Sequence, residues 1–197
     1  RIPLTYQKDP KVVGGYAYLK YDENYLCAMV DLTAARDVRK GMFTGFVFDT
    51  RHDGYQYRTS EDNFDINVDV TRVYFDKIYL NVYSMQNAPY IREVIAAATF
   101  GKSPNSSDNS LKFEVGIPMK TLTKYPNPED PNRIGFTVGA WNLSNLYGYG
   151  PLPFETLPDL VFTSTPIPDL SYKSLTGALA IGATFCALRK KRSRRFF

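Results

Sequence analysis

Residues 16–32 read YAYLKYDENYLCAMVDL, and this stretch decides the class of fold. Two runs of aromatic and aliphatic residues, 16–21 and 25–32, flank the short polar segment Asp22-Glu23-Asn24. Aromatic and β-branched side chains favour extended strands, whereas Asp and Asn tolerate the backbone of a tight turn. The stretch therefore predicts an antiparallel β-hairpin.

The same pattern recurs along the chain. Residues 111–117 alternate apolar and polar side chains, as a strand with one solvent-facing side must. Residues 101–110 form a polar segment rich in turn formers, and residues 119–122 are expected to form one short helical turn. Further strands are expected at 43–49, 63–70, 73–84, 92–100, 134–142 and 160–163. The fold class is therefore all-β, an antiparallel, jelly-roll-like β-sandwich followed by a C-terminal hydrophobic helix.

The end of the chain has a different character. Residues 175–188 (LTGALAIGATFCAL) carry no charge, and six of the next seven residues are Lys or Arg. An apolar run stopped by a basic cluster is typical of a stop-transfer segment, which places the preceding residues on the extracellular face of the membrane. Its 14 residues span only about 21 Å as a helix, against a hydrocarbon core of roughly 30 Å. A removable sorting signal, or a buried helix followed by a solvated tail, are the alternatives.

The expected organisation follows from these patterns. An N-terminal arm occupies residues 1–14, the β-sandwich 15–164, a linker 165–174 and the hydrophobic helix with its basic tail 175–197. Pro168-Asp169-Leu170, followed by the apolar run and the basic cluster, resembles the C-terminal signals read by exosortase and archaeosortase enzymes. Those signals usually carry Pro-Glu-Pro, Pro-Glu-Phe or Pro-Gly-Phe where this chain has Pro-Asp-Leu.

Three segments resemble the family 9 carbohydrate-binding modules and their DOMON-like relatives over about residues 15–145. They are Tyr-Leu-Lys-Tyr-Asp-x-x-Tyr-Leu at 18–26, Phe-Val-Phe-Asp-Thr at 46–50, and Phe-Glu-Val-Gly-Ile-Pro at 113–118 leading into 134–136. The resemblance implies an extracellular β-sandwich that binds saccharide ends, haem or other ligands, and that often holds structural calcium. Those modules typically clamp a sugar between two aromatic rings, often Trp, and this chain has one Trp.

Candidate ligand-binding residues are aromatic, because a flat ring packs well against the C–H groups of a sugar. The single tryptophan is joined by tyrosines that stand in loop-like contexts; the candidates are Trp141, Tyr55, Tyr57, Tyr147 and Tyr149. Packing of these rings in the core or at its rim is the competing interpretation.

Candidate metal ligands cluster within 17 positions, between the end of one expected strand and the start of the next: Asp49, Asp53, Glu61, Asp62 and Asp65. Calcium takes several oxygen ligands, and a loop that turns back on itself can gather them. The spacing differs from that of an EF-hand, and ordinary solvated acids are the alternative.

Haem is not expected, because His52 is the only histidine and stands in a loop, away from Met29 and Met85 in strand-like runs.

Catalysis and nucleic-acid binding are not expected. The sequence lacks the usual nucleophile, zinc and phosphate-binding motifs. Six of the 24 Lys and Arg lie in 189–195, so residues 1–188 carry a net charge of about −2, which does not favour binding to phosphates.

The sequence thus predicts a non-catalytic, membrane-tethered module that binds a carbohydrate or another cell-surface ligand. The alternative is a structural subunit of a surface layer, filament or larger secreted protein, assembling through its own strand edges.

Overall fold

A computed structural model describes residues 1–54, 62–75, 77–86, 88–149 and 157–163. The elements in chain order are β1 (Ile2–Tyr6), β2 (Asp9–Tyr21), β3 (Tyr25–Leu32), β4 (Phe43–Asp49), β5 (Asn63–Tyr74), β6 (Lys77–Tyr83), the 3₁₀ helix η1 (Ile91–Glu93), β7 (Ile95–Lys102), β8 (Asn109–Pro118), α1 (Met119–Leu122), β9 (Arg133–Trp141), β10 (Leu146–Tyr149) and β11 (Asp159–Val161).

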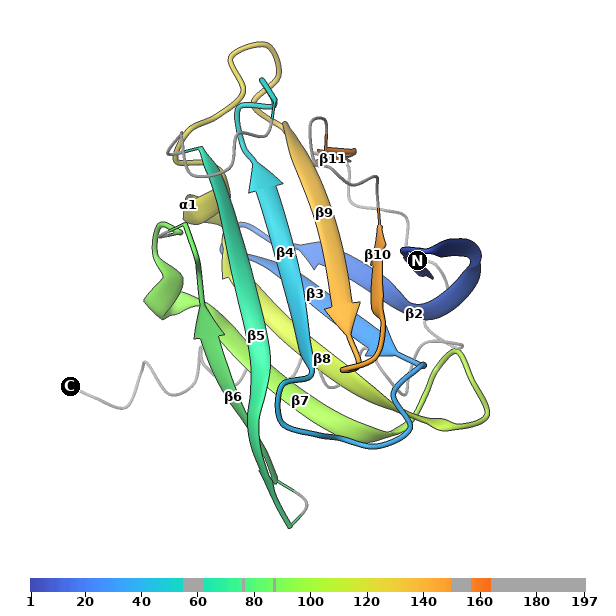
Figure 1. The fold of residues 1–197 in the computed structure, drawn as a ribbon. Coiled ribbons are helices and arrows are strands. Elements are labelled where there is room, and N and C mark those ends of the chain that lie inside the picture. The colour runs from blue at the N-terminus through green and yellow to red at the C-terminus, as the bar shows by residue number, and fades with distance from the viewer. Residues whose placement is uncertain (55–61, 76, 87, 150–156, 164–197) are drawn as a thin grey trace, which may run out of the picture. The chain divides into compact units, whose positions relative to one another are not determined.

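One antiparallel sheet runs in the order β6-β5-β4-β9-β10-β1-β2-β3-β8-β7, and β11 pairs with β9. The sheet curls so that β5, β4 and β9 form one layer and β3, β8 and β7 another behind it (Figure 1). The two edge strands, β6 and β7, contact each other, but no ladder joins them within the described ranges. The all-β antiparallel class is therefore confirmed, and the hydrogen bonding is continuous where a sandwich would have two separate sheets.

The core lies between the two layers. Every second residue along each strand faces inward, and these side chains fill the core. Phe48 lies at its centre, with ring centroids 5.2 Å from Phe64 and 5.4 Å from Phe136. All three are at most 2% exposed. Because the side-chain period of a strand is two, the residues between these face outward and form the outer surface of the sheet.

The hairpin at 16–32 is confirmed, with its turn at residues 22–24. Asp22 stabilises the turn by accepting hydrogen bonds from the backbone N–H groups of Asn24 and Tyr25, at 2.7 and 2.8 Å. The helical turn Met119–Leu122 is also confirmed. The bounds expected for the strands at 63–70 and 73–84 are wrong, because β5 continues to Tyr74 and β6 begins only at Lys77. The strand predicted at 92–100 instead begins with η1 and then becomes β7.

The N-terminal arm is part of the sheet. Residues 1–14 contain β1 and the first half of β2, which pair with each other, and β1 also pairs with β10. Strand β10 was not expected. It forms because Gly148 lies opposite Gly139 of β9 while Thr5 of β1 pairs on its other side.

This arrangement gives a prediction for Gly14, over which the Tyr147 ring is packed. A Cβ atom on Gly14 would lie 2.1 Å from Cδ1 of Tyr147. We expect Gly14→Ala to lower the free energy of unfolding by about 2 kcal/mol, because the ring must be displaced. Gly101→Ala is the matched control, since its Cβ would meet only Nζ of Lys112 at 3.9 Å. Urea denaturation measures both, and equal stabilities of the two variants would contradict the packing of β10 on β2.

The C-terminal segments lie outside the described residues. This applies to the predicted linker (165–174) and to the hydrophobic helix with its basic tail (175–197). Within the part of the chain that the structure describes, no helix has the length and apolar character needed to cross a membrane.

Candidate ligand-binding site

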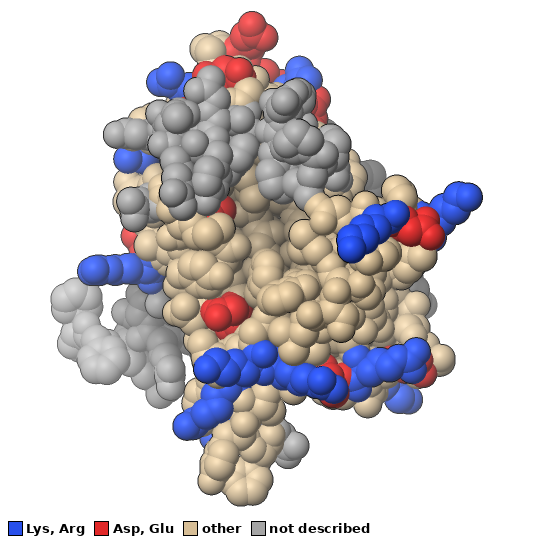
Figure 2. Space-filling model, viewed as in Figure 1, with Lys and Arg blue, Asp and Glu red and all other residues tan. Residues whose placement is uncertain are grey.

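A row of three glycines crosses the outer face of the sheet. Gly45 of β4 lies opposite Gly139 of β9, which lies opposite Gly148 of β10. A Cβ on Gly148 would meet only the carbonyl oxygen of Val138, at 3.6 Å. On Gly139, the nearest atoms would be the Tyr147 carbonyl oxygen at 3.2 Å and a Leu146 methyl at 3.8 Å. Figure 2 shows that the face formed by β4 and β9 is hollowed, and we give the name sheet-face hollow to the part of this face around the glycine row.

Aromatic side chains form one side of the sheet-face hollow. The neighbouring row of residues on the same face contains Leu146, Trp141 and Phe43, from β10, β9 and β4. The Trp141 and Phe43 rings make an edge contact, with centroids 5.6 Å apart and planes at 61°. Both side chains are half-buried, so part of each ring faces solvent. The hollow therefore has an apolar, ring-lined border.

Polar side chains of β5 and β6 continue these two rows. Asp69 pairs with Phe43 across the ladder, and Asn67 pairs with both Gly45 and Tyr83. Oδ1 of Asp69 is shielded from solvent and has no hydrogen-bond partner among the described residues. Burial raises the pKa of Tyr83, and the carboxylates of Asp69 and Asp65 raise it further. The Tyr83 hydroxyl thus stays protonated near these acids. A half-buried carboxylate, an amide and a protonated phenol suit a ligand that brings hydroxyl groups.

Figure 2 shows the chemical character of this face. Its centre is largely uncharged, with one acidic side chain standing within it, and Lys and Arg gather towards its margins. A largely uncharged surface with a few acceptors suits a neutral, hydroxyl-rich ligand better than a phosphate or a nucleic acid.

The structure separates the other predicted aromatic residues from Trp141. Tyr147 does not stand in a loop: it lies in β10, points to the core side and is 5% exposed, packed at 5.8 Å against Tyr6. Tyr149 lies in the same strand and packs against the core, so its predicted loop context is also wrong. Tyr55 and Tyr57 lie outside the described residues. Of the predicted set, Trp141 is the residue that borders the hollow.

Three of the predicted metal ligands come together at the far end of β4. Side-chain oxygens of Asp49, Asp53 and Asp62 lie within 4.8 Å of one another. The chain turns back after β4, and the Thr50 backbone N–H donates to the Asp62 carbonyl oxygen at 3.0 Å. Asp49 is fully buried and accepts hydrogen bonds from the N–H groups of His52 and Gly54, at 2.7 and 3.0 Å.

Burial raises the pKa of Asp49, and the carboxylates of Asp53 and Asp62 raise it further against the two backbone hydrogen bonds. The cluster therefore concentrates negative charge that a cation would offset. Three carboxylates in a returning loop could hold a calcium ion.

The other two predicted metal ligands are not part of this cluster as described. Asp65 does not belong to it. It caps the turn after β6, accepting from the N–H groups of Met85 and Gln86 at 2.9 and 3.1 Å. Glu61 lies outside the described residues.

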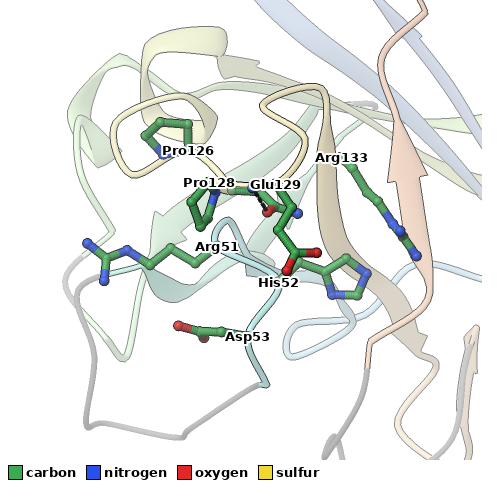
Figure 3. Close-up of a pocket in the computed structure, with 8 residues that line it drawn as sticks. Arg51, His52, Asp53, Pro126, Pro128, Glu129 and Arg133 are labelled. Carbon is green, nitrogen blue, oxygen red and sulfur yellow. Dashed lines mark hydrogen bonds between the residues drawn. The ribbon is translucent and has the colours of Figure 1, made fainter.

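A pocket of about 640 Å³ opens beside this acidic cluster. It is lined by Arg51, His52, Asp53, Pro126, Asn127, Pro128, Glu129 and Arg133. The lining comes from the turn after β4, the loop before β9 and the first residue of β9, and Arg51 extends away from His52 (Figure 3). These residues include no aromatic ring besides the imidazole and no hydroxyl or thiol nucleophile. The pocket suits a charged ligand rather than the flat face of a sugar.

His52 has a structural partner that the sequence did not indicate. Its Nε2 pairs with Asp159, whose other oxygen accepts from Arg133 at 2.5 Å. These contacts fasten β11 against the start of β9. Hydrogen bonds from His52 and Arg133 lower the pKa of Asp159. The lowered pKa means that this contribution to stability is present above the ordinary Asp value and is lost as the pH falls through the folded-state value.

The two candidate sites lie at opposite ends of the same strand. Arg133 begins β9 beside the acidic cluster, and Trp141 ends it beside the sheet-face hollow. Eight residues at about 3.4 Å each place them about 27 Å apart. A cation at the cluster would therefore stabilise the fold without contacting a ligand in the hollow.

Comparisons with a collection of protein-family models, with curated proteins and with solved structures each gave no match to this chain.

Proposed function

We propose that this chain is a non-catalytic, cell-surface module that binds a saccharide in the sheet-face hollow. The observation that carries the proposal is the flat strip of open backbone at Gly139 and Gly148 beside the Trp141 ring, in a row whose third glycine, Gly45, is covered by the Asn67 side chain. A pyranose ring could lie on this strip with its C–H face against the tryptophan. The half-buried Asp69 carboxylate, beside Phe43 in the ladder, would then accept a hydrogen bond from a sugar hydroxyl through its more accessible oxygen.

The sequence supports the location. The apolar run at 175–188 and the basic cluster that follows are those of a membrane anchor or a sorting signal, and either would hold the module on the extracellular face. The described residues that line the pocket beside the acidic cluster include no hydroxyl or thiol nucleophile, which favours binding over catalysis there.

A glycan array and a blocked variant test the proposal. Gly148→Val is expected to fold normally, because its Cβ has room and valine suits a strand. Its methyl groups would occupy the floor of the hollow and lower the affinity for the bound glycan at least tenfold, about 1.4 kcal/mol. Gly101→Val is the control, since Gly101 is also open but lies on β7. Glycan binding retained in full by Gly148→Val would contradict the site. A blank array together with ordered oligomers would favour the structural role instead.

We also propose calcium as a stabilising ion at Asp49, Asp53 and Asp62. At a concentration 100 times its dissociation constant, an ion bound only by the folded state adds about 2.7 kcal/mol. For a domain of this size the melting temperature should rise by roughly 5–10 °C on adding calcium. Asp53→Asn should reduce the rise, and Asp108→Asn, an exposed acid elsewhere, should leave it unchanged. Thermal unfolding with calcium and with a chelator measures this, and equal curves for the unaltered protein would refute the ion.

The stabilisation by calcium should depend on pH in a defined direction. Without an ion, the raised pKa of Asp49 favours its protonated form, so its contribution to stability is present below the ordinary value of 3.8 and is lost as the pH rises through the folded-state value. A cation binds the ionised carboxylates and competes with protons. The rise in melting temperature on adding calcium should therefore be larger at neutral pH than at pH 4.

A further inference from the structure

The β5–β6 hairpin extends beyond the rest of the sheet. Strand β4 begins opposite Asp69, and the last backbone contacts from the preceding loop reach Val70, from Gly41 and Met42 at 2.8 Å. Past this point β5 pairs only with β6. Tyr74, the last residue of β5, lies four residues further, about 14 Å along the strand, and Phe75 follows it. The end of the hairpin thus projects from the body of the molecule (Figure 1).

The projecting end is apolar and strained. Phe75 is 83% exposed, and Tyr74 and Val73 beside it are 55% and 40% exposed. The Tyr74 and Phe75 rings contact each other edge-on, with centroids 4.5 Å apart. Phe75 also has a φ of +49°, a left-handed conformation that is unfavourable for a bulky residue. This turn holds two aromatic rings in water at the end of a two-stranded hairpin, in a strained backbone conformation. The arrangement does not stabilise the isolated fold.

Basic side chains lie along this end and beside its base. Arg72 stacks on the rings of Tyr74 and Tyr79, at 5.4 and 4.6 Å, and Lys77 lies opposite Tyr74 at the tip. The loop that contacts Val70 adds three exposed basic residues, Arg36, Arg39 and Lys40, of which Arg39 pairs with Asp37 at 2.6 Å. Figure 2 shows a band of Lys and Arg across the molecule just above the projecting tip. Asp76, which completes the turn in the sequence, lies outside the described residues.

We propose that this hairpin inserts its tip, Tyr74 and Phe75, into the surface of an anionic membrane. Apolar rings enter the boundary between headgroups and acyl chains to a depth of about 5–10 Å, which a projection of about 14 Å reaches without immersing the body. Basic residues at the base then lie at the level of the headgroups, where each contributes about 1 kcal/mol with anionic lipids. The projecting shape and the band of positive charge fit a lipid surface better than the groove of a protein partner. The inference is independent of the saccharide site.

Fluorescence of a tryptophan placed at the tip tests the insertion in the full chain. Phe75→Trp is mixed with vesicles of phosphatidylcholine containing 30% phosphatidylserine, with and without brominated acyl chains. We expect a blue shift of the emission and strong quenching by the brominated lipid. Both should weaken at high salt and be at least tenfold weaker with phosphatidylcholine alone. Tyr90→Trp is the matched control, because Tyr90 is 43% exposed and follows the far end of β6; its tryptophan should not be quenched.

Each alternative gives a distinct result. If the chain reaches the vesicles only through its C-terminal segment, the protein sediments with them but the tryptophan at position 75 is not quenched, and the proposal fails. Equal quenching at positions 75 and 90 indicates non-specific adsorption and also overturns it. A blue shift that depends on protein concentration and appears without vesicles identifies a second copy of the chain as the occupant of the tip.

Discussion

Asp31→Ala is expected to lower the free energy of unfolding by about 3 kcal/mol, the largest effect of any single change considered. The Asp31 carboxylate is fully buried and accepts three side-chain hydrogen bonds. Ser103 and Asn105 each donate to Oδ2 at 2.7 Å, and Ser110 donates to Oδ1. Alanine would leave all three donors without this acceptor and would open a cavity beside them.

The network joins β3 to the loop between β7 and β8. It also extends to Tyr18, whose hydroxyl donates to Asn105 at 2.6 Å. Asp37→Ala is the matched control: its carboxylate is half exposed, pairs only with a neighbouring Arg39 and should change stability by less than about 1 kcal/mol. Urea denaturation monitored by circular dichroism measures both. Similar small changes for the two variants would show that the buried network is not needed for stability.

Trp141→Ala is expected to weaken saccharide binding about 30-fold, or roughly 2 kcal/mol. The indole is the largest flat ring beside the glycine row, and Phe43 holds it by an edge contact at 5.6 Å. Removing it leaves the polar side of the hollow in place, so residual weak binding should remain. Isothermal titration with the glycan selected on the array measures the affinity directly.

Phe100→Ala controls for general loss of aromatic surface. Phe100 is 38% exposed on β7, the edge strand at the opposite end of the sheet order. Its removal should leave the affinity unchanged. Equal losses in the two variants would indicate a change in folding or adsorption, and unchanged binding by Trp141→Ala would exclude the ring from the site.

Local patterns in the sequence predicted the elements that depend on local chemistry. The hairpin at 16–32 and the helical turn at Met119–Leu122 follow from turn-forming residues and from alternation, which act within a few positions. Strand β10 could not be found this way. Its sequence, LYGY, has no alternation and becomes extended because β9 and β1 pair on its two sides.

In the candidate sites, too, some residues could be predicted from local sequence and others could not. Asp49, Asp53 and Asp62 were predicted to approach one another because the loop of 13 residues between the two strands, 50–62, must return on itself. The glycine row was not predicted, since Gly45, Gly139 and Gly148 are aligned only by the register of three strands. No signal in one sequence marks such a register. Asp65 and Tyr147 lie apart from the other predicted site residues for a related reason, because strand geometry directs each to a partner that sequence spacing does not show.

Mapping the bound saccharide by amide chemical shifts tests the central claim most directly. Titration of the isotopically labelled protein with the selected glycan should shift the backbone signals of Gly45, Gly139 and Gly148, together with the indole N–H of Trp141. The signals of His52 and Arg133, about 27 Å away at the other end of β9, should stay unchanged. Shifts confined to that far end, with the glycine signals unmoved, would contradict a saccharide site in the sheet-face hollow.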